Sequence, residues 1–174
     1  MNTTAWTFET GAGGWGNGEA QYYTSRADNI KSENGILAIT AKKENYGGAN
    51  YTSARIKSHG KVSCKYGMIE AKIKCPWGAT GVWPAFWMMG ENISTYGWPS
   101  CGEIDIMEQM CTSNPATWNK TLSTFHWNNR GVVQGGYDHG MYGSDVNLGE
   151  QLGVSYRIYG IECTRNALSG YVKD

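Results

Sequence analysis

Alternation of apolar and polar side chains along short segments is the feature that most constrains this chain, because helical periodicity is hard to find in it. In GMIEAKIKC, every second residue from Ile69 to Cys75 is apolar, and the residues between them are Glu or Lys. Side chains of a strand alternate between two faces, so this pattern predicts a strand with one face on a core. Similar strands are predicted at 36–42, 121–127 and 156–163.

Glycine- and asparagine-rich segments separate these stretches and indicate turns, for example NYGGAN at 45–50 and WNNRG at 127–131. Many short strands without crossover helices predict an all-β chain that folds as an antiparallel sandwich or barrel. The 174 residues contain no Pro/Ser-rich or charged linker, so we expect a single domain over residues 1–174.

Fifteen Lys and Arg balance fifteen Asp and Glu, and no basic cluster forms a stripe along the sequence. We therefore expect no nucleic acid partner and no binding to a membrane surface. No apolar run approaches the roughly 20 residues of a membrane span, and the polar start NTTAWTFET carries no export signal. Eight Trp and eleven Tyr suit a surface that packs on flat sugar rings, so carbohydrate is the expected class of ligand.

Further motifs give little support to other chemistries. GAGGWG at 11–16 matches a dinucleotide-binding spacing, but no helical pattern follows it to hold a pyrophosphate. The histidines His59, His126 and His139 lack the spacing of a zinc helix, and no G-x-S-x-G elbow is present. The five cysteines form no C-x-x-C pair, and we expect most of them to be reduced thiols in the core.

The stretch GEIDIMEQM carries three carboxylates on an otherwise apolar strand. Strict alternation puts Glu103 and Asp105 on one face and Glu108 on the other. A β-bulge at Ile106 or Met107 would bring Glu108 onto the face of the other two acids. The Cα atoms of Glu103 and Glu108 would then lie about 13 Å apart, and side chains that lean together could shorten the carboxyl separation to about 5 Å.

Two Glu carboxyl groups at that separation suit a retaining glycosidase, in which one attacks the sugar and the other acts as acid and then as base. Burial beside apolar groups and other carboxylates raises carboxyl pKa values, which is costly unless a site uses the shift. Two alternatives remain open for these residues. They could form a Ca²⁺ site, or they could belong to a solvated acidic strand without a site.

Together with its neighbours, this strand resembles a known family. GEIDIME, preceded by GVWPAFWMMG and followed by TFHW, is similar to the active-site region of glycoside hydrolase family 16, in particular its laminarinase-like endo-1,3-β-glucanases. WTFETGAGGWGNGEAQYYT near the start and YRIYGIECTRNALSGYVKD at the end match the family in the same order. The resemblance implies an antiparallel β-sandwich of the jelly-roll type with a concave substrate cleft.

The resemblance also implies roles for single residues. Glu103 would be the nucleophile, Asp105 its assisting acid, and Glu108 the general acid and base. The substrate-binding residues that it implies are Trp83, Trp87, Trp98, His126, Asn17 and Arg55. Plainer alternatives are a core position for Trp87, a hydrogen-bonded strand residue for His126 and a surface ion pair for Arg55.

The length of the acidic strand bears on the substrate. The E-x-D-x-x-E form with Met107 resembles laminarinases, agarases and carrageenases, whereas lichenases have one residue fewer. Arg55 is the only obvious basic candidate for a sulfated or anhydro sugar, so the resemblance favours retaining endo-hydrolysis of neutral β-1,3-glucan. Mixed-linkage glucan and marine galactans remain alternative substrates, and a glucan-binding domain without turnover is the alternative function.

Family members carry further strands before WTFETG and after YVKD, so we expect an incomplete sandwich. Exposed sheet edges would favour a homodimer or a strand-exchanged oligomer. We expect no required cofactor. The family's structural Ca²⁺ draws on terminal segments, so the sequence gives little support for an occupied site, and no metal ligands are assigned. Secretion is the localisation that the resemblance implies.

Overall fold

The computed structural model describes residues 1–174, and it confirms the all-β expectation. The only helices are a short α1 (Ile93–Tyr96) and a 3-10 turn at Pro115–Asn119. The strands are β1 (Thr7–Glu9), β2 (Gln21–Tyr23), β3 (Ile30–Glu33), β4 (Ile36–Ile39), β5 (Lys42–Tyr46), β6 (Ala49–Ser53), β7 (Arg55–Lys57), β8 (Gly67–Ile73), β9 (Ala85–Met89), β10 (Glu103–Glu108), β11 (Lys120–Asn128), β12 (His139–Asn147), β13 (Arg157–Cys163) and β14 (Leu168–Lys173).

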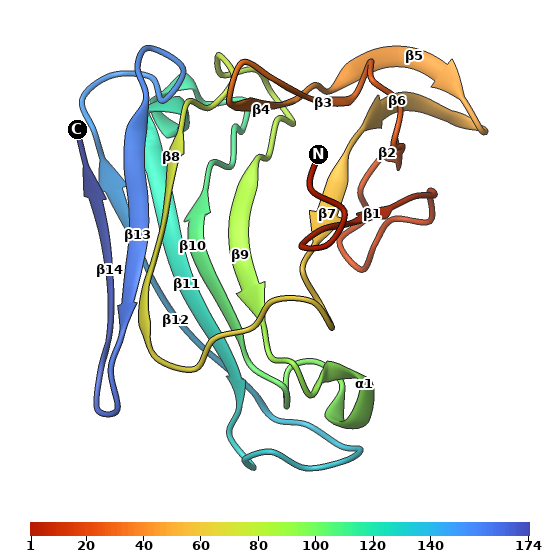
Figure 1. Cartoon of the computed structure of the whole chain (residues 1–174). Coiled ribbons are helices and arrows are strands. Elements are labelled where there is room, and N and C mark those ends of the chain that lie inside the picture. The colour runs from red at the N-terminus through yellow and green to blue at the C-terminus, as the bar shows by residue number, and fades with distance from the viewer. The chain divides into compact units, whose positions relative to one another are not determined.

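The chain forms two compact units, Met1–Ser63 and Cys64–Asp174, and each is described by itself. The single domain expected over 1–174 stays a prediction. In the N-terminal unit β1 pairs with β7, β3 pairs with β4, and β2, β6 and β5 form a three-stranded sheet in that order (Figure 1). The 11–16 glycine segment leads into no helix there, because residues 11–19 form turns and isolated bridges.

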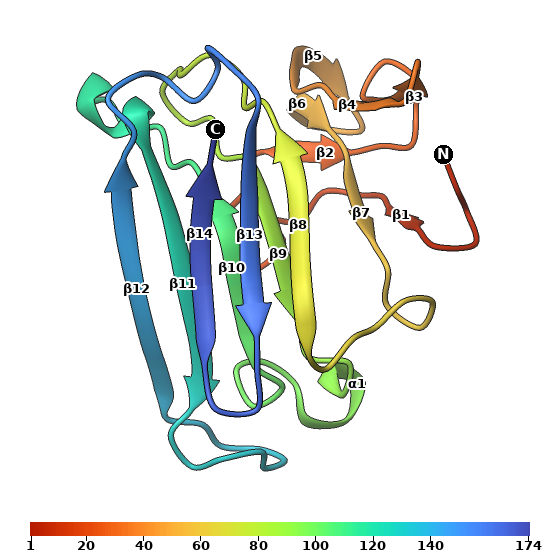
Figure 2. The same cartoon turned by 60° about the vertical axis from the view of Figure 1, so that its left-hand side comes forward.

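The C-terminal unit consists of two antiparallel sheets that lie face to face, as Figure 2 shows. One sheet has the order β12-β11-β10-β9 and the other has the order β14-β13-β8. The core between them is built chiefly from Ile106 and Met107 of β10, Tyr159 and Ile161 of β13, and Leu152. The sandwich predicted from the sequence is therefore the architecture of this unit.

The alternation predicted along residues 67–75 is present in β8. Ile69 and Ile73 pack against the core and Cys75 is buried, whereas Glu70 and Lys72 are exposed. A strand with one face on a core and one face toward solvent has this pattern. The predicted strands at 121–127 and 156–163 are confirmed as β11 and β13, each with ends shifted by a residue or less.

The single strand predicted at 36–42 is wrong, because the segment divides into β4 and β5. The backbone of Thr40 is held by Asn29, whose side chain is fully buried. The Thr40 amide donates to the Asn29 carbonyl over 2.8 Å, and the Asn29 Nδ2 donates to the Thr40 carbonyl over 3.1 Å. These bonds separate the two strands at a point where the residue pattern looks continuous.

The β-bulge predicted near Ile106 and Met107 is present in β10. Glu103 and Asp105 lie opposite His126 and Thr124 of β11, but Glu108 lies opposite Leu122, so three steps along β10 match two along β11. The register against β9 shifts between Asp105 and Met107 as well. Ile106 and Met107 therefore both enter the core, although they are neighbours in the sequence.

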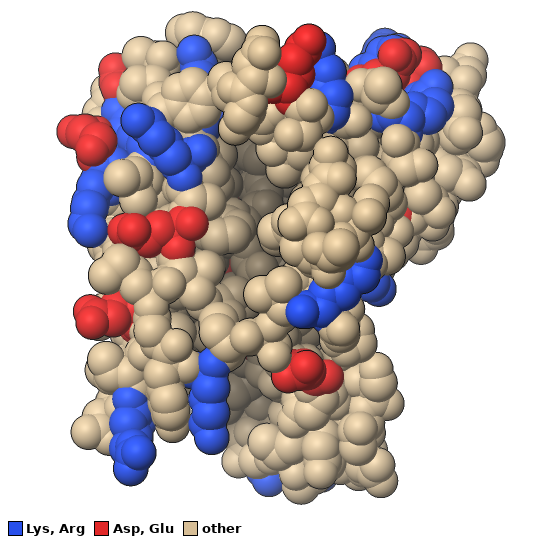
Figure 3. Space-filling view, in the orientation of Figure 1, with Lys and Arg blue, Asp and Glu red and all other residues tan.

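All five cysteines are free. Cys75, Cys111 and Cys163 are buried, which agrees with the expected core thiols, whereas Cys64 is exposed and Cys101 is partly buried. Among the helices of the structure, none has the length and apolar character needed to cross a membrane. On the face displayed in Figure 3, Lys and Arg are interspersed with Asp and Glu.

Truncation of the bulge residue tests its contribution to the core. Met107 is only 1% exposed. We expect Met107→Ala to lower the free energy of unfolding by about 2–5 kcal/mol, because it leaves a cavity. Met107→Leu conserves most of the volume and should cost less than about 1.5 kcal/mol. Urea denaturation followed by tryptophan fluorescence measures both values, and equal losses in the two variants would contradict this packing role.

Candidate active site

The three acids of β10 lie on the face of the sheet that points away from the core. Ile104, Ile106 and Met107 belong to the core or pack against it. Glu103 and Asp105 alternate with these apolar residues, and the bulge adds the one residue needed to return Glu108 to the same face. The charges of Glu103 and Glu108 both act on Asp105, as expected when the carboxyl groups are neighbours.

An indole group contacts each of the two glutamates. Trp98 donates through Nε1 to Glu103 Oε2 over 2.5 Å, and Trp83 donates through Nε1 to Glu108 Oε1 over 2.8 Å. Both tryptophans are 42% exposed, so each ring also presents surface to solvent. The acids are thus held from two sides by donors that leave flat apolar surface beside them.

Asp105 is the most buried of the three acids, at 4% exposure. Burial is the main cause that raises the pKa of Asp105 to about 8, and the charges of Glu103 and Glu108 and a hydrogen bond to Glu103 raise it further. Asp105 Oδ2 also lies 3.1 Å from His126 Nε2. A carboxyl group in such surroundings holds its proton at a pH where a solvated one has lost it.

The surroundings of Glu108 favour its protonated form. Burial raises the pKa of this carboxyl, the Trp83 hydrogen bond lowers it, and the charge of Glu103 raises it. The net shift is upward. A carboxylic acid in this state can donate a proton to a leaving oxygen.

His126 faces the same site from β11, directly opposite Glu103 in the register. Burial lowers the pKa of His126, the charge of Glu103 raises it, and His139 lowers it. His126 Nδ1 lies 2.9 Å from His139 Nε2, and the His139 ring centroid lies 4.6 Å from that of Trp98. His139 was not singled out as a site residue from the sequence, because nothing there showed that residues 139–147 pair with β11.

Trp87 lies on the same face of the sheet as the three acids of β10. It pairs with Asp105 in the ladder between β9 and β10, and its neighbours Phe86 and Met88 pack against the core. Directly opposed residues of neighbouring strands share a face. The core position considered for Trp87 is therefore wrong, because alternation along β9 turns its side chain away from the core.

Asn17 and Arg55 belong to the N-terminal unit. Asn17 Nδ2 lies 3.4 Å from Glu19 Oε1. The Arg55 guanidinium lies 5.1 Å from the Trp15 ring centroid, and its Nε donates to Glu9 Oε2 over 2.6 Å. The ion pair considered for Arg55 is thus present. The structure brings the other seven predicted site residues together in the C-terminal unit.

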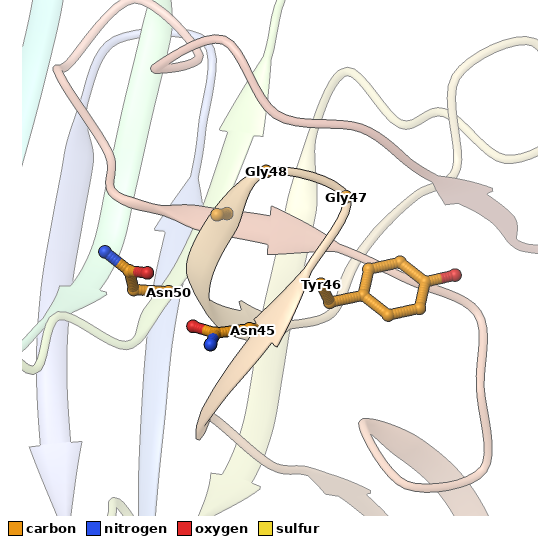
Figure 4. A pocket seen from close by; sticks show the side chains of 6 residues that line it. Asn45, Tyr46, Gly47, Gly48 and Asn50 are labelled. Carbon is orange, nitrogen blue, oxygen red and sulfur yellow. The ribbon is translucent and has the colours of Figure 1, made fainter.

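A hollow on the β5–β6 hairpin offers no comparable chemistry. Asn45, Tyr46 and residues 47–50 line it, as Figure 4 shows. Glu44, the residue before Asn45 in β5, is engaged by the Arg26 guanidinium and the Thr52 hydroxyl. A hollow without two carboxyl groups cannot supply both a nucleophile and an acid. Across residues 1–174, no group of three or more His, Cys, Asp or Glu side chains is arranged to hold a metal ion.

A β-sandwich whose inner strand presents two Glu and one Asp on its open face, with indoles on both sides, has the parts of a glycosidase that uses paired carboxyl groups. The family model described as the XgeA-like catalytic GH16 domain matches residues 6–140. The chain belongs to glycoside hydrolase family 16, and the resemblance inferred from its motifs is confirmed.

Its relatives include the beta-glucanase of Rhodothermus marinus, which is 37% identical over 174 residues covering 97% of this chain and 57% of the relative. The clotting factor G alpha subunit of Tachypleus tridentatus is 43% identical over 169 residues, which cover 96% of this chain and 23% of the relative. The X-ray structure of the Rhodothermus marinus laminarinase matches with a TM-score of 0.85 and 34% identity, over 100% of this chain and 66% of that one. This likeness confirms the jelly-roll sandwich. The chain spans 57% or less of the length of these two relatives.

The raised pKa of Asp105 predicts how an isosteric change acts on stability. The unfolded chain releases this proton at about pH 3.9, so between about pH 4 and about pH 8 the folded state binds more protons and its stability falls as the pH rises. Asp105→Asn has no proton to lose. The free energy of unfolding of the variant, relative to that of the parent, should therefore increase by about 1 kcal/mol for each unit that the pH rises in the middle of this range. Urea titrations from pH 4 to pH 9 measure the difference, and a constant difference would contradict the assigned shift.

Proposed function

We propose that this chain hydrolyses β-1,3-glucan internally, with net retention at the anomeric carbon. The observation that carries the proposal is the bulge in β10, which gives Glu108 the same face as Glu103 and Asp105. Without it, the two glutamates would lie on opposite faces of the sheet and could not act on one sugar. The laminarinase of Rhodothermus marinus, with its similar fold, supports the choice of substrate.

Glu103 is the proposed nucleophile. As a carboxylate it attacks the anomeric carbon, the bond from that carbon to the leaving oxygen breaks, and a covalent glycosyl-enzyme forms. The Trp98 indole donates to Glu103 Oε2, which orients the carboxylate without protonating it. Trp98 cannot be a competing acid, because an indole N–H is a donor only and does not titrate in this range.

Glu108 is the proposed general acid and base. Its raised pKa favours a protonated carboxyl, which gives its proton to the leaving oxygen while Glu103 attacks. The resulting carboxylate then removes a proton from water, and that water attacks the anomeric carbon and releases Glu103. The full cycle balances in protons, because Glu108 gives one proton to the leaving oxygen in the first half-reaction and takes one from water in the second.

Asp105 is the proposed assistant of the nucleophile. Its carboxyl shares a hydrogen bond with Glu103, and burial keeps it protonated well above the usual range of an Asp pKa. A protonated Asp105 adds a donor to Glu103 rather than a second negative charge. This arrangement limits the negative charge that surrounds the attacking group.

The glucan would lie along the open face of this sheet, against the exposed rings of Trp83 and Trp98 and beside Trp87. Pyranose rings present flat C–H faces that suit such surfaces. A polysaccharide is too large to enter a cell intact, so we propose that the chain meets its substrate outside the cell. The homodimer or strand-exchanged oligomer remains an expectation from the sequence, which gives little support for an occupied structural Ca²⁺ site.

A glucan-binding domain without turnover is the second candidate. The relative from Tachypleus tridentatus carries the name of a clotting factor subunit and not of a hydrolase, and it covers nearly the whole of this chain. This candidate expects affinity for laminarin without release of reducing sugar. Mixed-linkage glucan and galactan substrates are distinguished in the same assay by comparing laminarin, lichenan, agarose and carrageenan.

Replacement of the nucleophile tests the assigned role. Glu103→Gln keeps the shape of the side chain and removes its charge, so we expect reducing-sugar release from laminarin to fall by at least about 100-fold. Its circular dichroism and unfolding midpoint should remain those of a folded protein. Glu162→Gln is the matched control, since Glu162 is an exposed residue of β13 in the other sheet. Activity retained in Glu103→Gln would refute the assignment.

The stereochemistry of the product tests the double displacement. Attack first by Glu103 and then by water inverts the anomeric carbon twice, so the first product should carry the β configuration of the glucan. Proton NMR of laminarin hydrolysis, recorded before mutarotation, resolves the two anomers. An initial α product would indicate a single displacement by water and would leave Glu103 as a base.

A further inference from the structure

His139 closes a ring of contacts around the proposed nucleophile. One path runs from Glu103 to the Trp98 indole and on to the His139 ring, which packs against it with 4.6 Å between the ring centroids. The other path runs from Glu103 through Asp105 and His126 to His139 Nε2, with 3.1 Å between Asp105 and His126 and 2.9 Å between the two imidazoles. His139 is the residue at which the two paths meet.

The hydrogen-bonding capacity of these groups limits where the protons lie. Burial lowers the pKa of His126, so its imidazole is neutral and has one N–H donor and one acceptor. The Asp105 carboxyl shares its proton with Glu103, which leaves its Oδ2 to accept from His126 Nε2. His126 Nδ1 is then an acceptor, and its partner, His139 Nε2, is the donor.

We propose that His139 is a positioning residue: it donates from Nε2 to His126 Nδ1 and thereby fixes the tautomer in which His126 donates to Asp105. If His139 did not donate, His126 could carry its proton on Nδ1 and turn a lone pair toward Asp105. The Asp105 proton would then point at His126 and away from Glu103. The role of His139 in turnover rests on the proposed function, whereas the tautomer itself does not.

The titratable groups that face this pair come from two strands. Glu103 and Asp105 approach His126 from β10, and His139 approaches it from β12. The charge of Glu103 favours protonation of His126, but burial is the larger effect and favours the neutral ring. Glu108 acts on this network through Asp105. The neutral tautomer is therefore the form on which the proposal depends.

The fold holds His139 in place at the first residue of β12. It pairs with Asn128, which is buried and donates from Nδ2 to the Ser100 hydroxyl over 2.8 Å. Asn128 Oδ1 also accepts from the amide of Asp138, the residue just before His139, over 2.9 Å. These bonds fix the backbone that carries the imidazole, although the side chain itself is exposed.

Two variants at this position separate donation from packing. His139→Gln retains an N–H donor on a side chain of similar reach, whereas His139→Met fills the space against Trp98 without a donor. Nitrogen-15 NMR of the imidazole rings reports the tautomer of His126 directly. The chain has only three histidines, and exposed His59 of the N-terminal unit can be changed to Gln for assignment and as a control.

In the parent chain we expect His126 to be protonated on Nε2. We expect the same tautomer in His139→Gln. In His139→Met, we expect His126 to populate the form that is protonated on Nδ1. A parent His126 protonated on Nδ1 would overturn the proposal even if no variant folds. An unchanged tautomer in folded His139→Met would also overturn it.

Turnover gives a second readout. With laminarin, His139→Met should lower kcat by about tenfold, as expected for one lost hydrogen bond that acts on the reacting groups. KM should change little, and the pH profile of kcat/KM should shift, while His139→Gln and His59→Gln remain close to the parent. A rise in KM at constant kcat would instead assign His139 to sugar binding and overturn the positioning role. Absence of laminarin cleavage by the parent would refute the proposed function and leave the NMR result to decide the tautomer.

Discussion

The burial of two consecutive side chains, Ile106 and Met107, is the constraint on which the candidate site depends. Full burial of a Met side chain is worth about 1.5–3 kcal/mol, whereas a ladder hydrogen bond left unmade at a bulge forfeits about 0.5–1.5 kcal/mol. The apolar contribution is the larger one. Burial of both side chains therefore favours the irregular register of β10. As a result, Glu108 lies on the same face as the other two acids.

Three carboxyl groups on one face are unfavourable by themselves, and the surrounding donors offset the cost. Each glutamate accepts from an indole, Asp105 Oδ2 lies 3.1 Å from His126 Nε2, and the Asp105 backbone carbonyl accepts from the Ser123 hydroxyl. The groups also differ in burial, which separates their affinities for protons. The local environment of one strand thus raises the pKa of two neighbouring carboxyl groups, Asp105 and Glu108.

The sequence allowed the sandwich, the face of β8 and the bulge to be predicted, because each depends on the order of apolar and polar residues along one strand. The division of 36–42 and the side of Trp87 could not be predicted in this way. The division of 36–42 depends on Asn29, a residue distant in the sequence that binds the Thr40 backbone. The orientation of Trp87 depends on which face of β9 packs against the core. His139 was missed because its contact with His126 requires the pairing of β11 with β12.

The position of β12 at the edge of its sheet has a thermal consequence. Every residue of this strand except Gly140 is exposed, whereas β10 lies between two neighbours and carries core residues. An edge strand with few buried contacts opens locally at a lower free energy than the centre of the sheet. On warming, His139 should therefore leave His126 before the carboxyl groups lose their places. Turnover would then begin to fall through fraying of one edge, before the core melts.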